Sequence, residues 1–67
     1  MKIGQTIRKR NKFVEVVIEK ARMDGEIGYY LQAFDITKNP KVRTHYQFTR
    51  NLPNITNALE ELTYQPK

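Results

Sequence analysis

An Asp-Gly pair at positions 24 and 25 constrains this chain more than any other local feature. It lies between two runs, 13–23 and 26–36, that are rich in β-branched and aromatic residues. Asp and Gly both tolerate the positive φ angles that the centre of a two-residue type I′ turn requires. The sequence therefore predicts a β-hairpin in which Met23 pairs with Glu26.

The predicted pairing fixes which residues share a face, because partners on opposite strands point the same way. One face, the core face, collects apolar side chains: Val14, Val16, Ile18, Ile27, Tyr29, Leu31 and Ala33. The other, the outer face, is mixed: Phe13, Glu15, Val17, Glu19, Tyr30, Gln32, Phe34 and Ile36. A shift of one residue would mix the two sets, so the pattern supports the turn. We expect Glu15 and Glu19 to be exposed and to aid solubility.

Residues 37–50 predict a loop followed by a third strand. Asn-Pro with flanking lysines at 38–41 cannot continue a central strand. Apolar and polar residues alternate in segment 42–50, which indicates a half-buried antiparallel strand. The alternation places two groups on opposite sides: Val42, Tyr46 and Phe48 on one, and Arg43, His45 and Gln47 on the other, beside the outer face.

The last part of the chain predicts a short amphipathic helix that covers the core face. Four apolar residues recur at helical spacing, with Ala58 beside them: Leu52, Ile55, Leu59 and Leu62. Asn51 or Asn54 can cap its N-terminus, and Pro53 is acceptable only in the first turn.

Positive charge is concentrated at the N-terminus. The first twelve residues hold five basic side chains and no acid: Lys2, Arg8, Lys9, Arg10 and Lys12. The other 55 residues hold seven basic and seven acidic side chains, so the net charge of +5 comes entirely from this segment. Such blocks are interaction tails or solvated segments. If the segment is extended, it forms an edge strand that bends at Asn11, with Arg8 and Arg10 pointing one way and Lys9 the other.

These elements predict a single α+β domain over residues 1–67. Its antiparallel sheet has three to four strands and its C-terminal helix packs on one face (β-β-β-α), while residues 1–12 form a basic arm or edge strand. A chain of 67 residues without cysteine has marginal stability of its own. We therefore expect a homodimer.

The composition predicts that the protein is not an enzyme. The chain has no Ser, no Cys and a single His, so the usual nucleophile-and-base pairs cannot form. We expect no metal site, no phosphate-binding glycine loop and no cofactor. No apolar run is long enough to span a membrane or to form the core of a signal peptide, so we expect a cytoplasmic protein that does not bind membranes.

The outer face predicts a stacking platform for unpaired bases, because aromatic rings there lie near arginine and amide groups. Tyr30, Phe34 and His45 are the candidates for contacts with bases. Candidates for contacts with phosphate are Lys2, Arg8, Lys9, Arg10, Lys12, Lys41 and Arg43. Phosphate contacts are salt-dependent and carry no sequence information. The expected function is therefore a non-catalytic nucleic-acid-binding domain that favours single strands or contacts without sequence preference.

Other interpretations stay open. In one, the outer aromatic residues are buried in the homodimer or beneath an N-terminal strand folded across them, because exposed apolar patches rarely stay bare. In another, the chain is a protein-interaction module, such as a small host or phage regulator, that docks on an acidic protein. The basic arm, residues 1–12, would then steer association. Alternatively, the segment 7–12 is a solvated strand end that prevents edge-to-edge aggregation.

The order of elements over roughly Lys12 to Leu62 is similar to that of the transcriptional-coactivator type of single-stranded-DNA-binding domain. In that family a twisted antiparallel sheet precedes a C-terminal helix, and a dimer binds unpaired strands on its sheet surfaces. The resemblance lies in the layout of the elements. It carries over no individual binding residue.

Overall fold

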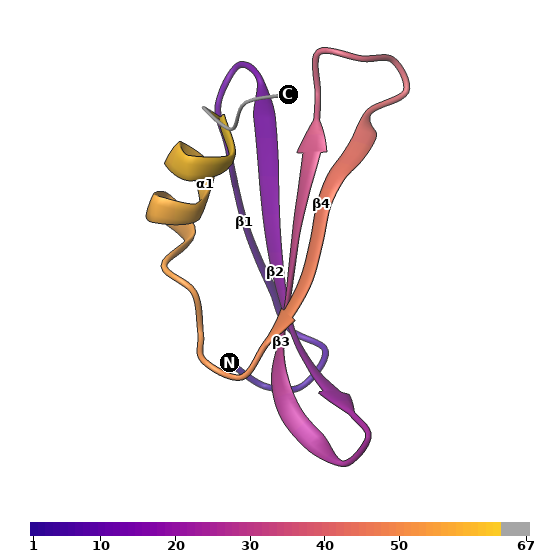
Figure 1. Ribbon diagram of the computed structural model, residues 1–67, viewed down its shortest axis with the longest axis vertical. Helices are drawn as coiled ribbons and strands as arrows, with labels where there is room; N and C mark the ends of the chain where they lie inside the picture. The colour runs from indigo at the N-terminus through magenta and orange to yellow at the C-terminus, as the bar shows by residue number, and fades with distance from the viewer. Residues whose placement is uncertain (64–67) are drawn as a thin grey trace.

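The computed structural model describes residues 1–63, which form a four-stranded antiparallel sheet followed by one helix (Figure 1). The elements are β1 (Thr6–Arg10), β2 (Val14–Met23), β3 (Glu26–Asp35), β4 (Val42–Thr49) and α1 (Ile55–Thr63). The strands lie in the order β1-β2-β3-β4, so each pairs with its neighbour in the chain. The predicted α+β class and the order of elements are confirmed.

The hairpin turn at Asp24-Gly25 forms as predicted. Asp24 has a φ of 51° and Gly25 a φ of 81°, the left-handed region that a type I′ turn needs. Met23 pairs with Glu26, and the ladder continues without a shift to Val14 opposite Asp35. The predicted division of β2 and β3 into a core face and an outer face therefore holds.

The N-terminal segment forms an edge strand, but β1 begins only at Thr6 and does not include the whole basic arm. Residues before Thr6 make a turn, in which the Gln5 N–H donates to the Lys2 carbonyl at 2.9 Å and Gly4 has a φ of 87°. From Thr6 onward β1 pairs with β2. The bend at Asn11 is confirmed, because its side-chain oxygen accepts hydrogen bonds from two backbone N–H groups, 2.8 and 2.9 Å away.

A β-bulge interrupts β4 and overturns the predicted faces of that strand. Ala33 pairs with His45, whereas the next residue of β3, Phe34, pairs with Arg43, so Thr44 is an extra residue on β4. A bulge of this kind reverses the alternation beyond it. His45 therefore lies on the core-face side of the sheet, and its predicted place beside the outer face is wrong. Gln47 lies with His45, whereas Tyr46 and Phe48 join Arg43 on the outer face.

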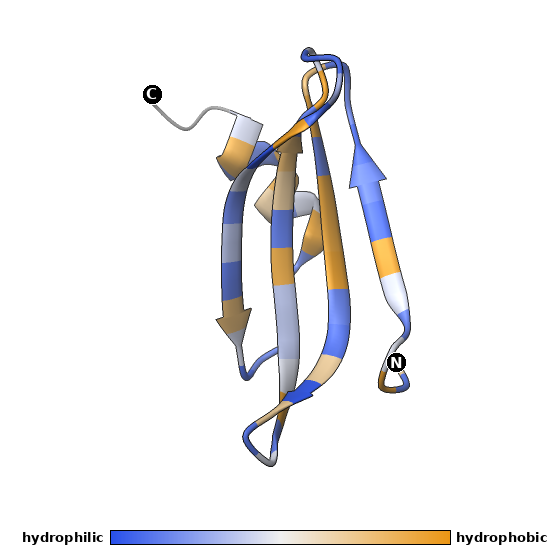
Figure 2. Ribbon diagram, turned by 90° about the vertical axis from the view of Figure 1, so that its right-hand side faces the viewer, coloured by the Kyte–Doolittle hydropathy of each residue, from blue (hydrophilic) through white to orange (hydrophobic). Residues whose placement is uncertain are grey.

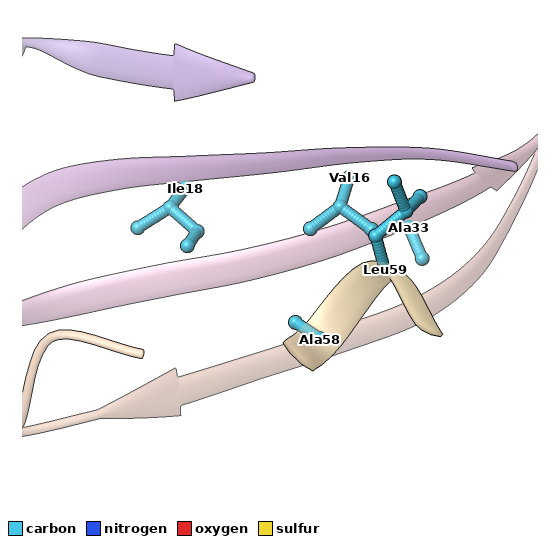
Figure 3. Packing of buried hydrophobic residues seen from close by; sticks show 5 residues of the cluster. All are labelled: Val16, Ile18, Ala33, Ala58 and Leu59. Atoms are coloured by element: carbon cyan, nitrogen blue, oxygen red, sulfur yellow. The ribbon is translucent and has the colours of Figure 1, made fainter. Parts of the chain in front are cut away.

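The core lies between the sheet and α1, which packs on β1 and β2. Its buried residues come from both layers: Val16, Ile18 and Ala33 from the sheet, and Ala58 and Leu59 from the helix (Figure 3). Asn54 is the helix cap, because its side-chain oxygen accepts the N–H of Asn57 at 3.1 Å. Leu52 precedes the helix and is 52% exposed, so its predicted place in the apolar stripe is wrong.

The helix covers only part of the core face. It packs on β1 and β2, and the hairpin end of that face is less enclosed, because Ile27 there is 48% exposed. Within residues 1–63, no helix has the length and apolar character that crossing a membrane requires.

Candidate nucleic-acid interface

The outer face is organised in rows that cross all four strands. The register of the sheet defines three rows: Thr6, Glu19, Tyr30 and Phe48; Arg8, Val17, Gln32 and Tyr46; Arg10, Glu15, Phe34 and Arg43. Each row places a β1 side chain at one margin and a β4 side chain at the other. The margins of one row are three strand spacings apart, about 14 Å.

Three rings form an aromatic cluster on this face: Tyr30, Tyr46 and Phe48. The centroid of Tyr30 lies 5.3 Å from that of Tyr46 in a tilted arrangement and 5.2 Å from that of Phe48 in an edge-to-face arrangement. These separations are in the favourable range for aromatic pairs. Desolvation raises the pKa of Tyr30 above its usual value, and the neighbouring Tyr46 raises it further by a smaller amount. The Tyr30 hydroxyl donates a hydrogen bond to the Sδ of Met23 at 3.3 Å.

Two cations lie over rings of the outer face. The Lys41 ammonium is 4.8 Å from the centroid of Phe34, and the Arg43 guanidinium is 4.7 Å from that of Tyr46. Both distances fit a cation–π contact. Each pair places a cation over one ring of the outer face.

The same lysine binds a buried carboxylate. Lys41 lies 2.8 Å from Glu15, whose side chain is only 8% exposed. The hydrogen bond from Lys41 lowers the pKa of Glu15 more than burial raises it, and the charges of Arg8 and Arg10 lower this pKa further. The prediction that Glu15 is solvent-exposed is wrong. Its charge is neutralised within the protein, because a buried carboxylate needs a partner.

Positive charge exceeds negative charge at the β1 margin. Arg8, Lys9, Arg10 and Glu15 line an open hollow of about 370 Å³. Among residues 1–63 the ion pairs within 4.0 Å are Lys41–Glu15 and Arg50–Glu26, so neither Arg8 nor Arg10 has a carboxylate partner at that distance. The turn after β1 and the loop after β3, which both carry lysines, lie at the same end of the sheet (Figure 1). The hollow therefore suits an anion.

The structure brings together six of the ten predicted contact residues on or beside the outer face: Arg8, Arg10, Tyr30, Phe34, Lys41 and Arg43. The other four lie elsewhere. Lys2 is in the turn before β1, and Lys12 is in the turn after it. Lys9 faces the helix, where its ammonium donates to the Thr56 hydroxyl at 3.0 Å, and His45 is on the opposite side of the sheet.

Tyr46 and Phe48 are outer-face residues that the sequence prediction missed. Their aromatic character was visible, but simple alternation from Arg43 placed them on the other side. The bulge at position 44 returns both side chains to the outer face, but this position is a threonine and not the Gly or Pro that would have indicated a bulge.

In the described part of the chain no three His, Asp or Glu side chains lie where they could hold a metal ion. Comparison with protein-family models, with curated proteins and with solved structures finds no match.

Proposed function

We propose that this protein is a small, non-catalytic domain that binds single-stranded nucleic acid across its outer face without selecting a sequence. One observation carries the proposal: four aromatic rings and three arginines share the sheet face that the helix leaves open. The rings are those of Tyr30, Phe34, Tyr46 and Phe48, and the arginines are Arg8, Arg10 and Arg43.

The proposed roles follow from positions in the rows. Arg8 and Arg10 project from the β1 margin, where they neutralise phosphates. The aromatic cluster lies toward the β4 margin, where bases stack on it, each contributing about 1–3 kcal/mol. Because about 14 Å separates the margins, a strand that crosses the sheet contacts both groups at once. Arg43, over the ring of Tyr46, supplies a phosphate contact beside a stacked base.

The carboxylates of the outer face oppose phosphate unequally. Glu15 is paired with Lys41 and is nearly covered, so it adds little repulsion. Glu19 has no ion-pair partner within 4.0 Å among residues 1–63 and remains the main unfavourable charge. Glu19 shares its row with Thr6 and Tyr30, which is the row farthest from Arg10. Its repulsion of phosphate is therefore weakest at the Arg10 end of the face.

A titration followed by fluorescence anisotropy tests the proposal. The labelled ligand is a short single-stranded oligonucleotide of mixed sequence, measured at low and at moderate salt, with a duplex of the same sequence as competitor. We expect the single strand to bind with an affinity that falls steeply with salt. The duplex should be a poor competitor. Absence of binding at low salt would refute the proposal.

The alternative is a protein-interaction module that docks on an acidic protein. The cations over Phe34 and Tyr46 favour it, because each covers part of a ring surface that a base would otherwise use. A glutamate-rich peptide of the same net charge as the oligonucleotide separates the two. Equal affinities for peptide and oligonucleotide would favour the protein partner, since only the oligonucleotide offers bases to stack.

Homodimer formation and a cytoplasmic location stay predictions from the sequence. Neither is needed for the outer face to bind a strand. The mass of the chain in solution, with and without the oligonucleotide, tests the first of them.

A further inference from the structure

We infer that the free edge of β4 is a self-association site, at which a second copy of this chain adds its own β4 in antiparallel orientation. The eight residues of β4 form one margin of the sheet and pair with β3 on one side. Among residues 1–63, no backbone hydrogen bond joins β4 to any segment other than β3. An edge of this kind is a template for another strand.

Charge selects β4 and not β1 as the edge that pairs with its own copy. The five residues of β1 include Arg8, Lys9 and Arg10, and the strand is mostly hydrophilic (Figure 2). Two such edges would place six positive charges side by side. In contrast, β4 carries Arg43 as its one lysine or arginine and no acid. Pairing of β1 with β4 would be head-to-tail and would give a ring or an open filament, whereas β4 with β4 closes as a two-fold dimer.

The bulge sets the register of this pairing. It distorts the edge at Thr44, so the regular part of β4 runs from 45 to 49 and its midpoint is Gln47. Antiparallel pairing about that midpoint places Gln47 opposite Gln47 of the second copy. His45 then meets Thr49 of the second copy on the core-face side, and Tyr46 meets Phe48 of the second copy on the outer face. No like charges face each other in this register.

The dimer would also enlarge the outer face. Tyr46 is 52% exposed at the β4 edge, so its ring is available for a cross-strand aromatic pair. The two aromatic clusters would meet at the centre of a continuous eight-stranded sheet, with the β1 arginines at its two ends. This consequence rests on the proposed function, whereas the edge pairing itself does not.

Sedimentation equilibrium of the full chain, from low to high micromolar concentration, tests the pairing. We expect the wild-type mass to approach twice the 8.0 kDa of the chain. Gln47 is exposed, so Gln47→Lys and Gln47→Glu should leave each chain folded, as circular dichroism reports, and should lower the melting temperature only by the loss of the dimer's contribution. Each variant alone places like charges at the two-fold axis and should sediment as a monomer. An equimolar mixture of the two should regain the dimer mass, because the introduced lysine then faces the introduced glutamate.

The matched controls are Thr6→Lys and Thr6→Glu, which change an exposed residue on the other edge and should leave the dimer mass unchanged. A wild-type mass of one chain at every concentration would overturn the inference. So would dimers that persist in both Gln47 variants. Anisotropy with the oligonucleotide reports separately on the outer face, so failure of strand binding with intact dimers refutes only the proposed function.

Discussion

The ring of Phe48 lies over the α-carbon of Gly28 on the outer face. A Cβ added to Gly28 would overlap Cζ of this ring and lie 2.6 Å from the carbonyl oxygen of Thr49. The ring therefore fills the space that a side chain at position 28 would occupy. From there it contacts Tyr30, which in turn contacts Tyr46. The absence of a side chain at position 28 thus positions the whole aromatic cluster.

Gly28→Ala should lower the free energy of unfolding by about 1–3 kcal/mol, the usual cost of overpacking a filled site. Urea unfolding measures it. Adding Phe48→Leu should restore only part of the loss, because the Thr49 carbonyl oxygen remains too close to the new methyl group. A Gly28→Ala protein as stable as the wild type would show that the ring does not hold this position in solution.

The depth of the core predicts a contrast between two isoleucines of the same sheet face. Ile18 is fully buried between the sheet and α1, so Ile18→Ala should cost about 2–5 kcal/mol of unfolding free energy. Ile27 is 48% exposed near the hairpin turn, and Ile27→Ala should cost about 1 kcal/mol or less. Thermal and urea unfolding of both variants check the difference. Equal losses would mean that the core extends to the hairpin turn.

Strand binding should depend on the arginines of the β1 margin. Arg8→Ala and Arg10→Ala should each weaken oligonucleotide binding at low salt and reduce the salt slope by about 0.7, because one fewer phosphate is neutralised. Both side chains are exposed, so the melting temperature should stay nearly unchanged. Arg22→Ala removes the same charge near the hairpin turn and should have little effect on affinity. Equal effects of all three would indicate a response to net charge alone.

Adjacent residues of β4 test which sheet face binds bases. Tyr46→Leu should lower affinity for a single strand by about 1–3 kcal/mol, because the ring lies on the outer face. His45→Leu should have no comparable effect, because His45 lies on the other side of the sheet. Anisotropy gives both affinities, and a mass measurement shows whether either change alters self-association. A larger loss from His45→Leu would place the binding surface on the helix side.

The hairpin was predictable because its signals are local and agree with one another. An Asp-Gly turn, β-branched flanks and one apolar face all specify the same register, and the observed pairing from Met23–Glu26 to Val14–Asp35 follows it. The cap at Asn54 is local in the same way. The bulge at Thr44 gave no such signal, since a threonine in an alternating segment reads as a regular strand residue. One extra residue was enough to misplace His45, Tyr46 and Phe48.

The environment of Glu15 was not predictable for a different reason. Its partner Lys41 is 26 residues away in the chain and reaches it from the loop between β3 and β4. Alternation correctly placed Glu15 on the outer face but could not show that neighbouring side chains would cover it. Its burial depends on tertiary contacts, which a pattern of strand residues does not encode.

Stability should fall in acid partly because of Glu15. Its pKa is lower in the folded protein than the ordinary value of 4.5, chiefly through the hydrogen bond from Lys41. As the pH drops through 4.5 toward the folded pKa, the unfolded chain binds more protons, so the free energy of unfolding decreases. Glu15→Gln should remove this contribution and flatten the dependence, as followed by urea unfolding over a pH series.

At neutral pH the two partners of this ion pair should respond unequally to removal. Glu15→Gln leaves the Lys41 ammonium, whose side chain is 49% exposed and can be hydrated. Lys41→Met instead leaves a carboxylate that is 8% exposed without its hydrogen-bond donor, which should cost about 1–3 kcal/mol. Lys41→Met should therefore be the more destabilising change. If Glu15→Gln proved the costlier substitution, the carboxylate would have to be hydrated in solution, and the burial of this pair on the outer face would be wrong.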